Sequence, residues 1–247
     1  MSKIVDHAVQ ADRQAPTVAL VLLPGLDGTG LLFANFAARF GLDVKIIVVS
    51  YPSDAALAYS ELEPIARSLL PKDLPFFLLG ESFSGPIAIS IAASRPPGLL
   101  GLILCCSFAR SPRPSLSVFR PLLPVAPVAA LPLALLSFFV LGRFSSTALR
   151  RSLAESLARV SAPALRARAG AALSVDVSAK LASVDVPVLY LRASEDRVVP
   201  ASASLLITDL APNTKIVEFS APHFLLQVLP TQTAAIVRDF MGIGGGL

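Results

Sequence analysis

The chain has 247 residues, 54% of them hydrophobic and 15% charged, and a formal net charge of +4. A chain of this length and hydrophobic content can bury the core of one α/β domain. The two cysteines, Cys105 and Cys106, are adjacent, which excludes a disulfide framework and a metal site built on cysteine spacing, so we expect both to be buried near a site. The N-terminus has no basic region followed by an apolar core, which argues against a secretory signal and predicts a cytoplasmic protein.

The first predicted strand is the apolar run Val18–Leu23, which leads into the glycine-rich loop Pro24–Gly30. The glycines let backbone N–H groups turn inward, and we expect the N–H of Leu26 to be one donor of an oxyanion pocket. The N–H of Phe83, which follows the predicted nucleophile described next, would be the other donor. A phosphate-binding loop is the alternative, but no Lys-Ser or Lys-Thr pair follows, so a nucleotide site is not expected.

A serine stands between the apolar run Pro75–Leu79 and the helix-like run Pro86–Ala93, in the sequence Gly-Glu-Ser-Phe-Ser-Gly. A sharp turn from strand to helix strains the serine backbone, and only small neighbours such as Gly80 and Ser84 let the two elements approach closely. The pattern is typical of a nucleophile elbow and predicts Ser82 as the nucleophile. A Gly/Ser-rich turn without chemistry is the alternative, and the flanking strand and helix disfavour it.

Apolar strand runs alternate with helical segments along the first half of the chain. The helical segments are predicted at Leu31–Phe40, Leu57–Leu70 and Ser84–Ser94. This alternation predicts a mostly parallel sheet covered by helices on both faces. The strand after the nucleophile helix ends at residues 104–107 without a carboxylate, so the acid that orients a catalytic base is expected later in the chain.

The predicted acid and base lie in the last third of the chain. A buried strand at Pro187–Arg192 is followed by a loop that contains Glu195 and Asp196. Ligand sites of parallel sheets gather at the carboxyl ends of the strands, so we predict Asp196 as the acid, with Glu195 as the neighbour most easily confused with it. His223 follows a late strand-like run and is the predicted base, whereas His7 lies in a charged N-terminal stretch and is expected to be exposed.

The stretch 109–182 differs from the rest of the chain and is predicted to be a helical cap. Residues 121–141 contain no charge, a pattern that would normally indicate a transmembrane helix, but four prolines interrupt a continuous span. Three interpretations follow: a membrane span, a contact with a membrane surface, and, as the leading one, a lid over an apolar pocket. For the lid, we predict Leu135, Leu136 and Phe138 as substrate contacts.

Charge is distributed unevenly along the chain. From residue 101 to residue 170, nine arginines oppose one acid, Glu155, which gives +8, whereas the remainder has 12 basic and 16 acidic residues, which gives −4. An ordinary solvated helix face is the simplest explanation. A cationic cap could instead steer an anionic carrier protein, a membrane surface or a carboxylate-bearing substrate. Nucleic acid is not expected, because the basic residues are not interleaved with stacking aromatics.

Taken in order, the glycine-rich loop, the Ser82 elbow, the Asp196 loop and the loop around His223 resemble the α/β-hydrolase superfamily over nearly the whole chain. The length and the single insertion are similar to those of small bacterial esterases, including the enzymes that cleave pimeloyl-carrier-protein methyl ester. The resemblance implies an α/β-hydrolase fold with a core at residues 1–108 and 183–247 and a cap at 109–182, inserted after the sixth strand.

The resemblance also implies a serine hydrolase that cleaves carboxylic esters of short to medium acyl chains through an acyl-enzyme, without a metal or cofactor. Ser82, His223 and Asp196 would form its catalytic triad. A thioesterase or acyltransferase acting on a carrier-bound or lipid acyl group, and a non-catalytic binding protein, remain alternatives, because a fold does not fix a function. A serine nucleophile disfavours the dehalogenase and epoxide hydrolase chemistry that the same fold supports with an aspartate.

Overall fold

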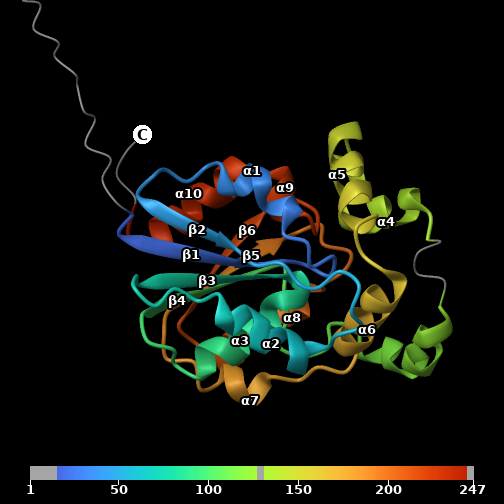
Figure 1. Ribbon diagram of the computed structural model, residues 1–247, viewed down its shortest axis with the longest axis horizontal. Helices are drawn as coiled ribbons and strands as arrows, with labels where there is room; N and C mark the ends of the chain where they lie inside the picture. The colour runs from blue at the N-terminus through green and yellow to red at the C-terminus, as the bar shows by residue number, and fades with distance from the viewer. Residues whose placement is uncertain (1–15, 127–130, 244–247) are drawn as a thin grey trace, which may run out of the picture.

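The computed structural model describes residues 16–126 and 131–243, so His7 lies outside the described residues (Figure 1). Within them, six parallel strands form one sheet in the order β2-β1-β3-β4-β5-β6. The predicted mostly parallel sheet is therefore confirmed. The strands are β1 Val18–Leu23, β2 Val44–Val48, β3 Phe76–Glu81, β4 Leu99–Cys105, β5 Val188–Ala193 and β6 Thr214–Phe219.

Helices cover both faces of this sheet (Figure 1). The helices on one face are α1 Ala34–Ala37, preceded by the short helix η1 Leu31–Phe33, together with α9 Leu225–Val228 and α10 Pro230–Phe240. The helices on the other face are α2 Tyr59–Ser68, α3 Gly85–Ala93, α7 Ser178–Leu181 and α8 Ala201–Leu210. The predicted helical segments near residues 31, 57 and 84 therefore all contain helices, each shorter than expected.

Each strand contributes to two apolar layers, because successive side chains of a strand point to opposite faces. In β1, Ala19 and Val21 pack with residues of α2 and α3, whereas Leu20 and Leu22 pack with residues of α1 and α10. All six residues of β1 are buried, as expected for a strand with partners on both edges and helices on both faces. The carboxyl ends of the strands then form one edge, where Leu23 of β1 pairs with Gly80 of β3.

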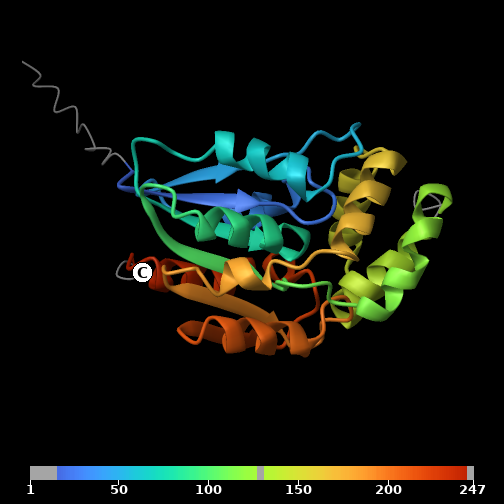
Figure 2. The ribbon, with the colours of Figure 1, turned by 90° about the horizontal axis from the view of Figure 1, so that it is seen from below.

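The insertion between β4 and β5 lies beyond this carboxyl edge, towards which the strand arrowheads point in Figure 2. We call residues 109–177 the cap. Its two ends are joined where the Ser111 N–H donates to the Val175 carbonyl at 2.9 Å and the Val177 N–H donates to the Ala109 carbonyl at 2.8 Å. The helices of the cap are η3 Pro114–Val125, α4 Leu133–Val140, η5 Gly142–Phe144, α5 Thr147–Leu157 and α6 Ala162–Ala172.

Two details of the predicted insertion differ in the structure. It follows β4 and not a sixth strand, because the described residues place only four strands before the insertion. The chain also returns to the sheet layer before residue 182, since α7 already packs on α3, with Lys180 Nζ 3.0 Å from Ser90 Oγ.

In the charge-free stretch 121–141, Pro132 immediately precedes the eight-residue helix α4. Among the described residues, no helix is both long and apolar enough to cross a bilayer.

Candidate active site

Ser82 lies at the turn from β3 into α3, in the short helix η2 Ser82–Ser84. Its backbone φ is 48°, in the left-handed region that residues other than glycine rarely adopt. Small neighbours permit the turn: a Cβ atom on Gly80 would lie 2.8 Å from a side chain of α3, and one on Gly85 would overlap the Ser107 side chain. The chain therefore has the strained geometry that was predicted for a nucleophile elbow at this position.

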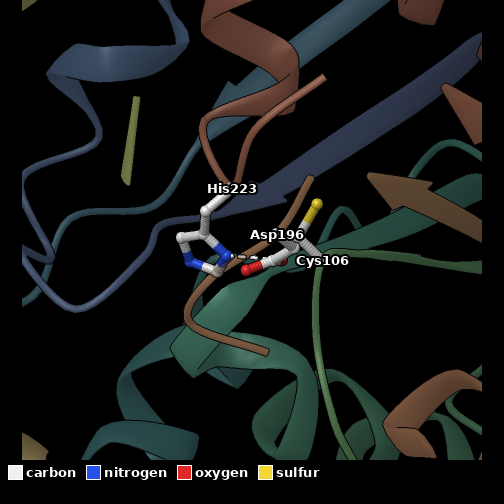
Figure 3. A group of neighbouring side chains, drawn as sticks. All are labelled: Cys106, Asp196 and His223. Carbon is white, nitrogen blue, oxygen red and sulfur yellow. Dashed lines mark hydrogen bonds and ion pairs between the residues drawn. The ribbon is translucent and has the colours of Figure 1, made fainter. Parts of the chain in front are cut away.

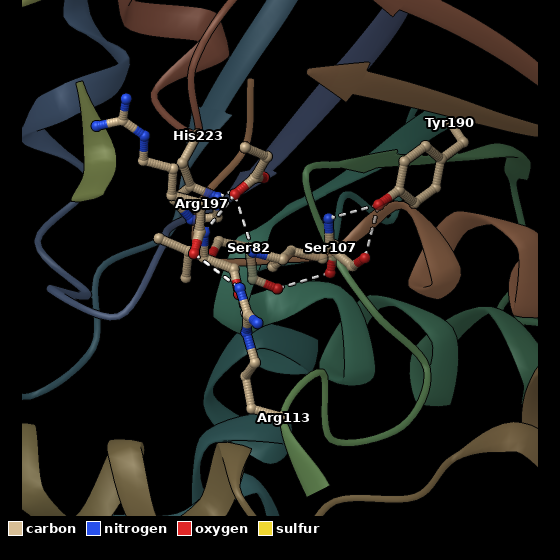
Figure 4. Close-up of polar contacts among 9 residues, drawn as sticks. Ser82, Ser107, Arg113, Tyr190, Arg197 and His223 are labelled. Carbon is tan, nitrogen blue, oxygen red and sulfur yellow. Dashed lines mark hydrogen bonds and ion pairs between the residues drawn. The ribbon is translucent and has the colours of Figure 1, made fainter. Parts of the chain in front are cut away.

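Ser82, His223 and Asp196 form one chain of hydrogen bonds. The Oγ of Ser82 lies 2.8 Å from the Nε2 of His223 (Figure 4). The Nδ1 of His223 lies 2.7 Å from the Oδ2 of Asp196, and both of these side chains are buried (Figure 3). Because Nδ1–H donates to the carboxylate, Nε2 of the neutral ring can accept the proton of the serine hydroxyl.

The two acidic residues of the loop after β5, Glu195 and Asp196, have different partners. The Oδ1 of Asp196 accepts hydrogen bonds from the N–H groups of Val198 and Val199, both at 2.8 Å, which leaves Oδ2 for the histidine. Glu195 is turned away and pairs with Arg143 of the cap, Nη2 to Oε1 2.5 Å, and this hydrogen bond lowers the pKa of Glu195. The structure thus places Asp196, and not Glu195, against the predicted base.

Buried charge surrounds the imidazole of His223. Burial acts to lower the pKa of His223, but the charges of Asp196 and Glu81 and the hydrogen bond to Asp196 outweigh burial and hold that pKa above its usual value. Glu81, the last residue of β3, is itself buried and accepts a hydrogen bond from Gln227 Nε2 at 2.9 Å. Burial raises the pKa of Glu81 to about 7. The sequence analysis missed Glu81, although a charged residue directly before the nucleophile was visible there.

The two predicted oxyanion donors are the amides of Leu26, in the loop after β1, and of Phe83, in the turn after β3. These two strands are neighbours in the sheet. Within residues 16–126 and 131–243, neither of their amides donates a hydrogen bond to another protein group, so both remain available to a ligand. Phe83 is held in place by Tyr59, whose ring stacks on it with 4.6 Å between centroids and whose hydroxyl donates to the Phe83 carbonyl at 3.0 Å. This arrangement suits stabilisation of a negatively charged oxygen beside Ser82.

Comparison with known proteins identifies the family and the fold. The model of the Alpha/beta hydrolase family matches residues 20–236. The chain belongs to the alpha/beta hydrolase family. Solved structures with the same fold include the enol-lactonase from Burkholderia xenovorans, with 16% identity, a TM-score of 0.80 and coverage of 92% of each chain. Another is an esterase from Exiguobacterium antarcticum, with 15% identity, a TM-score of 0.77 and coverage of 92% of this chain and 93% of that one.

A further sequence similarity links this alpha/beta hydrolase to a plant protein. It is 31% identical over 120 residues to "Phytyl ester synthase 1, chloroplastic" of Arabidopsis thaliana. The match covers 45% of this chain and only 16% of the plant protein. The similarity therefore concerns a small part of the larger protein.

Ser107 supports the elbow of this hydrolase from below and was missed in the sequence analysis. Its Oγ donates to the carbonyl of Ser82 at 2.6 Å (Figure 4). Ser107 is in turn fixed by Tyr190 of β5, whose hydroxyl accepts from the Ser107 N–H at 3.1 Å and donates to the Ser107 carbonyl at 2.7 Å. Because these partners are remote in sequence, no local pattern indicated the contact. The strained peptide of the nucleophile is thereby held by a buried hydroxyl.

Ser84 stands where the elbow pattern commonly has a glycine, and it joins the elbow to the glycine-rich loop Pro24–Gly30. Its buried Oγ donates to the Pro24 carbonyl, and because that uses its single proton, the hydroxyl of Tyr51 donates to Ser84 Oγ, at 2.8 Å. Burial raises the pKa of Tyr51 well above its usual value, so the tyrosine stays protonated as a donor. The departure from glycine therefore adds a connection between two loops that carry predicted site residues.

Cys106 lies beside the histidine and the aspartate of the hydrolase (Figure 3). Its Sγ, an Asp196 carboxylate oxygen and a His223 ring nitrogen lie within 4.8 Å of one another, a grouping that could offer three ligands to a metal ion. The hydrogen bond between Asp196 and His223 already accounts for two of these groups. The hydrogen bond that the Cys106 thiol donates to Cys105, together with burial, raises the pKa of Cys106 well above its usual value, and a neutral thiol is a poor ligand. Both cysteines are free and buried, as predicted.

The cap contacts the loops that carry Asp196 and His223 (Figure 4). Arg113 Nη2 donates to the Arg197 carbonyl at 2.9 Å, and Arg197 Nη1 donates to the Phe138 carbonyl at 2.9 Å. The Arg197 guanidinium also lies 4.2 Å from the centre of the Phe138 ring. The N–H of Phe224, next to the histidine, donates to the Val140 carbonyl at 3.0 Å. The cap is thus attached directly to the loops of the site.

The predicted substrate contacts lie on α4 of this cap. The side chains of Leu135 and Phe138 are 45% and 55% exposed, and Leu136 is partly buried. None of the three lines either cavity described below. Their role in binding a substrate therefore stays a prediction. The expectation of a solvated arginine face agrees with the exposure of Arg150, but it is wrong for Arg168, which is fully buried.

Two cavities flank the site. One of about 700 Å³ lies between α2, η3 and α6, and Tyr59, which stacks on Phe83, forms part of its wall. Its lining is mostly apolar, with Arg120 and Arg166 among the polar residues. The other, of about 150 Å³, lies between η1, α1, α5 and α9, and its lining includes Phe224, the residue after His223. Both cavities therefore adjoin neighbours of the predicted site residues.

Proposed function

We propose that this protein is a serine hydrolase that cleaves carboxylic esters through an acyl-enzyme. Ser82 Oγ attacks the ester carbonyl carbon while His223 Nε2 takes the hydroxyl proton, and Asp196 orients the ring and stabilises the imidazolium that forms. His223 then gives the proton to the departing alkoxide, so an alcohol leaves and an acyl-serine ester remains. The observation that carries this proposal is the buried hydrogen-bond chain, 2.8 Å from Ser82 Oγ to His223 Nε2 and 2.7 Å from His223 Nδ1 to Asp196 Oδ2.

Water completes the reaction in the second half. His223 Nε2 removes a proton from the water, whose oxygen attacks the acyl carbon, and the proton then returns to Ser82 as the carboxylic acid leaves. In both halves the carbonyl oxygen becomes an oxyanion, which we place between the free amides of Leu26 and Phe83. Removing one such donor in other enzymes lowers kcat by about 10²–10³, so this pocket is central to the proposal.

Covalent labelling tests the nucleophile directly. A fluorophosphonate probe should label the wild-type chain once, at Ser82 by peptide mass spectrometry, and Ser82→Ala should not react. Hydrolysis of p-nitrophenyl butyrate by Ser82→Ala should fall by about a thousandfold or more, leaving what substrate binding and the oxyanion pocket supply. Retention of more than about a tenth of the activity, or labelling at Ser84, would refute the assignment. An unlabelled and inactive wild-type chain would favour a binding protein on the same fold.

The substrate is proposed to be an ester with an apolar acyl part. The cavity of about 700 Å³ is mostly apolar and shares Tyr59 with the surroundings of Phe83. We further propose that Leu135, Leu136 and Phe138 close over longer chains, as a lid. Replacing Leu136 or Phe138 by serine should then reduce kcat/KM for octanoate esters more than for acetate esters. Equal losses on all chain lengths would assign α4 a structural role instead.

Transfer of the acyl group to an alcohol is a second candidate. It is favoured by the similarity of part of the chain to a protein whose name describes an ester synthase. The acyl-enzyme is the same in both reactions, and only the acceptor differs: an alcohol in place of water yields an ester. Adding a long-chain alcohol during turnover of a p-nitrophenyl ester and measuring the acid-to-ester product ratio separates the two. If the carboxylic acid is the sole product at every alcohol concentration, acyl transfer is refuted and hydrolysis remains as the proposed reaction.

We also propose that the cap contacts an anionic lipid surface. Val118 and Leu122 of η3 are 70% and 60% exposed, and Phe138 and Phe139 of α4 are exposed as well. Neither η3 nor α4, the helices that carry these residues, contains an acid, so they would not repel an anionic lipid surface. Such apolar exposure favours lipid over an anionic carrier protein, for which charge alone would suffice.

Vesicle binding tests this contact. The chain should sediment with vesicles rich in phosphatidylglycerol and less with phosphatidylcholine, and Leu122→Ser combined with Phe138→Ser should weaken both. Leu42→Ser is the control, because Leu42 is 75% exposed but lies outside the cap. Binding that ignores the paired cap substitutions, or that Leu42→Ser lowers equally, would refute a lipid contact through the cap. Binding to an acidic acyl-carrier protein without vesicle binding would favour the protein partner.

A further inference from the structure

One cap arginine contacts the loop that carries a predicted oxyanion donor. Residues 101–170 contain nine arginines. One of them, Arg168 of α6, has no exposed surface. Its Nη1 donates to the carbonyls of Leu26, at 3.1 Å, and Asp27, at 2.7 Å. Its Nη2 donates to the Pro52 carbonyl at 2.8 Å. A single buried guanidinium therefore joins the cap to the loop after β1 and to the segment after β2.

A second cap residue holds the same loop through its side chain. Asp27 is buried, and its Oδ2 accepts hydrogen bonds from the Thr29 hydroxyl, at 2.5 Å, and from Ser156 Oγ of α5, at 2.7 Å. The carboxylate also lies close enough to Arg168 for the two charges to attract each other. A buried guanidinium without polar partners would be strongly unfavourable, so the loop and the cap helices stabilise each other's position.

The loop is shaped to receive the guanidinium. Gly28 has a φ of 71°, and a Cβ atom at this position would overlap Arg168. The side chain of Leu26 packs against Val160, Ala164 and Leu165 of the cap. Leu26 is thus held by the cap on its side chain and at its carbonyl, while its amide remains free for a ligand.

The direction of the Leu26 amide follows from the same loop. The Gly28 N–H donates to the Gly25 carbonyl at 3.0 Å. The Gly25 carbonyl and the Leu26 N–H belong to one planar peptide unit and point in opposite directions. Fixing the carbonyl therefore aims the Leu26 N–H away from the loop interior. This orientation depends on the turn that the Gly28–Gly25 hydrogen bond closes. Arg168 binds the same turn through the carbonyls of its two central residues, Leu26 and Asp27.

We propose that Arg168 is a positioning residue for the oxyanion pocket, which makes the cap a structural component of catalysis as well as a cover over the substrate. The proposal rests on the ester hydrolase function and adds a mechanism of regulation to it. Preorganised donors stabilise the transition state because they need no reorganisation when charge develops. A cap displaced by a ligand or a surface would misalign the Leu26 amide and lower kcat, even where substrate binding is unchanged.

Three single variants separate positioning from general stability. Arg168→Met removes the hydrogen bonds but keeps an unbranched side chain, Arg168→Lys keeps the charge and part of the hydrogen bonding, and Arg159→Met makes the same change at an exposed arginine of the same cap. With p-nitrophenyl butyrate, Arg168→Met should lower kcat by about ten- to a hundredfold and change KM less than about twofold. This loss is smaller than that for removing an oxyanion donor outright, because the Leu26 amide is displaced and not deleted. Arg168→Lys should recover part of kcat, and Arg159→Met should match the wild type.

Hydrogen exchange supplies a readout that does not depend on turnover. In folded Arg168→Met, the amides of the loop 24–30 should exchange faster than in Arg159→Met, while those of β5 should not change. A wild-type chain that hydrolyses no ester would refute the proposed function, and the exchange experiment would still decide whether Arg168 holds the loop. If Arg168→Met does not fold, Arg168→Lys carries both measurements. Unchanged kcat and unchanged exchange in a folded Arg168 variant would overturn the proposal, as would an equal loss in Arg159→Met.

Discussion

The sheet and the cap both contain long apolar runs, and the structure buries them differently. All six residues of β3 are buried, although one of them is Glu81. In α4, which is apolar except for Ser137, Ser137 is the one buried residue and Phe138 and Phe139 are exposed. A strand inside a sheet has partners on both edges and helices on both faces, but a cap helix has protein on one side only. Hydrophobicity alone therefore does not show which segments form the core of this protein. An apolar segment is buried only where other elements pack against all of its sides.

Polar residues show the reverse contrast. Arg168 is among the largest fully buried side chains of the described residues, and it lies in the cap, where apolar side chains are exposed. Its burial is explained by the carbonyl groups of Leu26 and Asp27, in the loop after β1, which accept hydrogen bonds from its guanidinium. The cap thus contacts the core through specific polar contacts and presents apolar groups to its surroundings. This division suits a cover that must be aligned with a site and must also meet apolar ligands.

The largest expected effect is on kcat, and it distinguishes Asp196, which contacts His223, from Glu195, which contacts the cap. Asp196→Asn should lower kcat by about 10³–10⁴, because an amide cannot hold the histidine in the tautomer that accepts the serine proton. Glu195→Gln should lower it only a few-fold, since Glu195 contacts Arg143 of the cap. Steady-state kinetics on p-nitrophenyl butyrate compare the two. A larger loss in Glu195→Gln would mean that the acid has been assigned wrongly.

Stability measurements extend the comparison to apolar residues. Leu78 of β3 is fully buried, so Leu78→Ala should lower the free energy of unfolding by about 2–5 kcal/mol through lost burial and a cavity. Leu135→Ala in α4 should change it by no more than about 0.5 kcal/mol, because that side chain is already half exposed. Urea denaturation measures both. Similar losses at the two positions would show that the cap surface is buried in solution, for example in an oligomer.

Local sequence patterns predicted much of the core and of the site. The apolar run Val18–Leu23 coincides with β1, because a strand buried on both faces needs an unbroken apolar sequence. The elbow at Ser82 was predictable since its small neighbours lie within three residues of it. Asp196 and His223 were predictable from their order and from the strands before them, which end at the same edge of the sheet.

Contacts between remote segments could not be predicted in this way. Arg168 and Asp27 are 141 residues apart, and nothing near either residue distinguishes this arginine from its solvated neighbours in the cap. The same holds for Ser107, whose partner Ser82 lies on another element. Burial of a polar group depends on where its partners come together in three dimensions, so a sequence pattern that marks apolar periodicity carries no information about it.

Two glycines sharpen the comparison between core and cap. Gly85→Ala should destabilise the protein by about 1–3 kcal/mol, because the new methyl group would overlap Ser107 below the elbow. Gly170→Ala in α6 should stabilise it by up to about 1 kcal/mol, since its Cβ would meet Leu123 at 3.4 Å and alanine favours the helix. Thermal unfolding measures both shifts. In a Ser107→Gly background, Gly85→Ala should lower the free energy of unfolding by less. An equal loss in that background would show that the new methyl group does not clash with Ser107.

The smallest predicted effect concerns the pH dependence of the site. A catalytic base must be neutral to accept a proton, so kcat/KM should rise with pH as His223 loses its proton. The negative charge of Glu81 is one of the causes that raise the pKa of His223, and Glu81 itself has a pKa of about 7, so it carries most of this charge above that pH. Glu81→Gln removes that charge and keeps an acceptor for Gln227. The pKa of His223 then falls, and the acidic limb of the kcat/KM profile should move to lower pH.

The matched control for this shift is Glu61→Gln, which removes an exposed carboxylate from α2 and should leave the acidic limb in place. Proton titration of His223 by NMR provides a measurement independent of turnover, and its midpoint should move in the same direction as the kinetic limb. A limb that moves to higher pH in Glu81→Gln would mean that lost polar contacts around the ring outweigh the lost charge. Because Glu81 lies in β3 and its partner Gln227 in α9, this part of the electrostatics belongs to the core, and cap variants such as Arg168→Met should leave the limb unchanged.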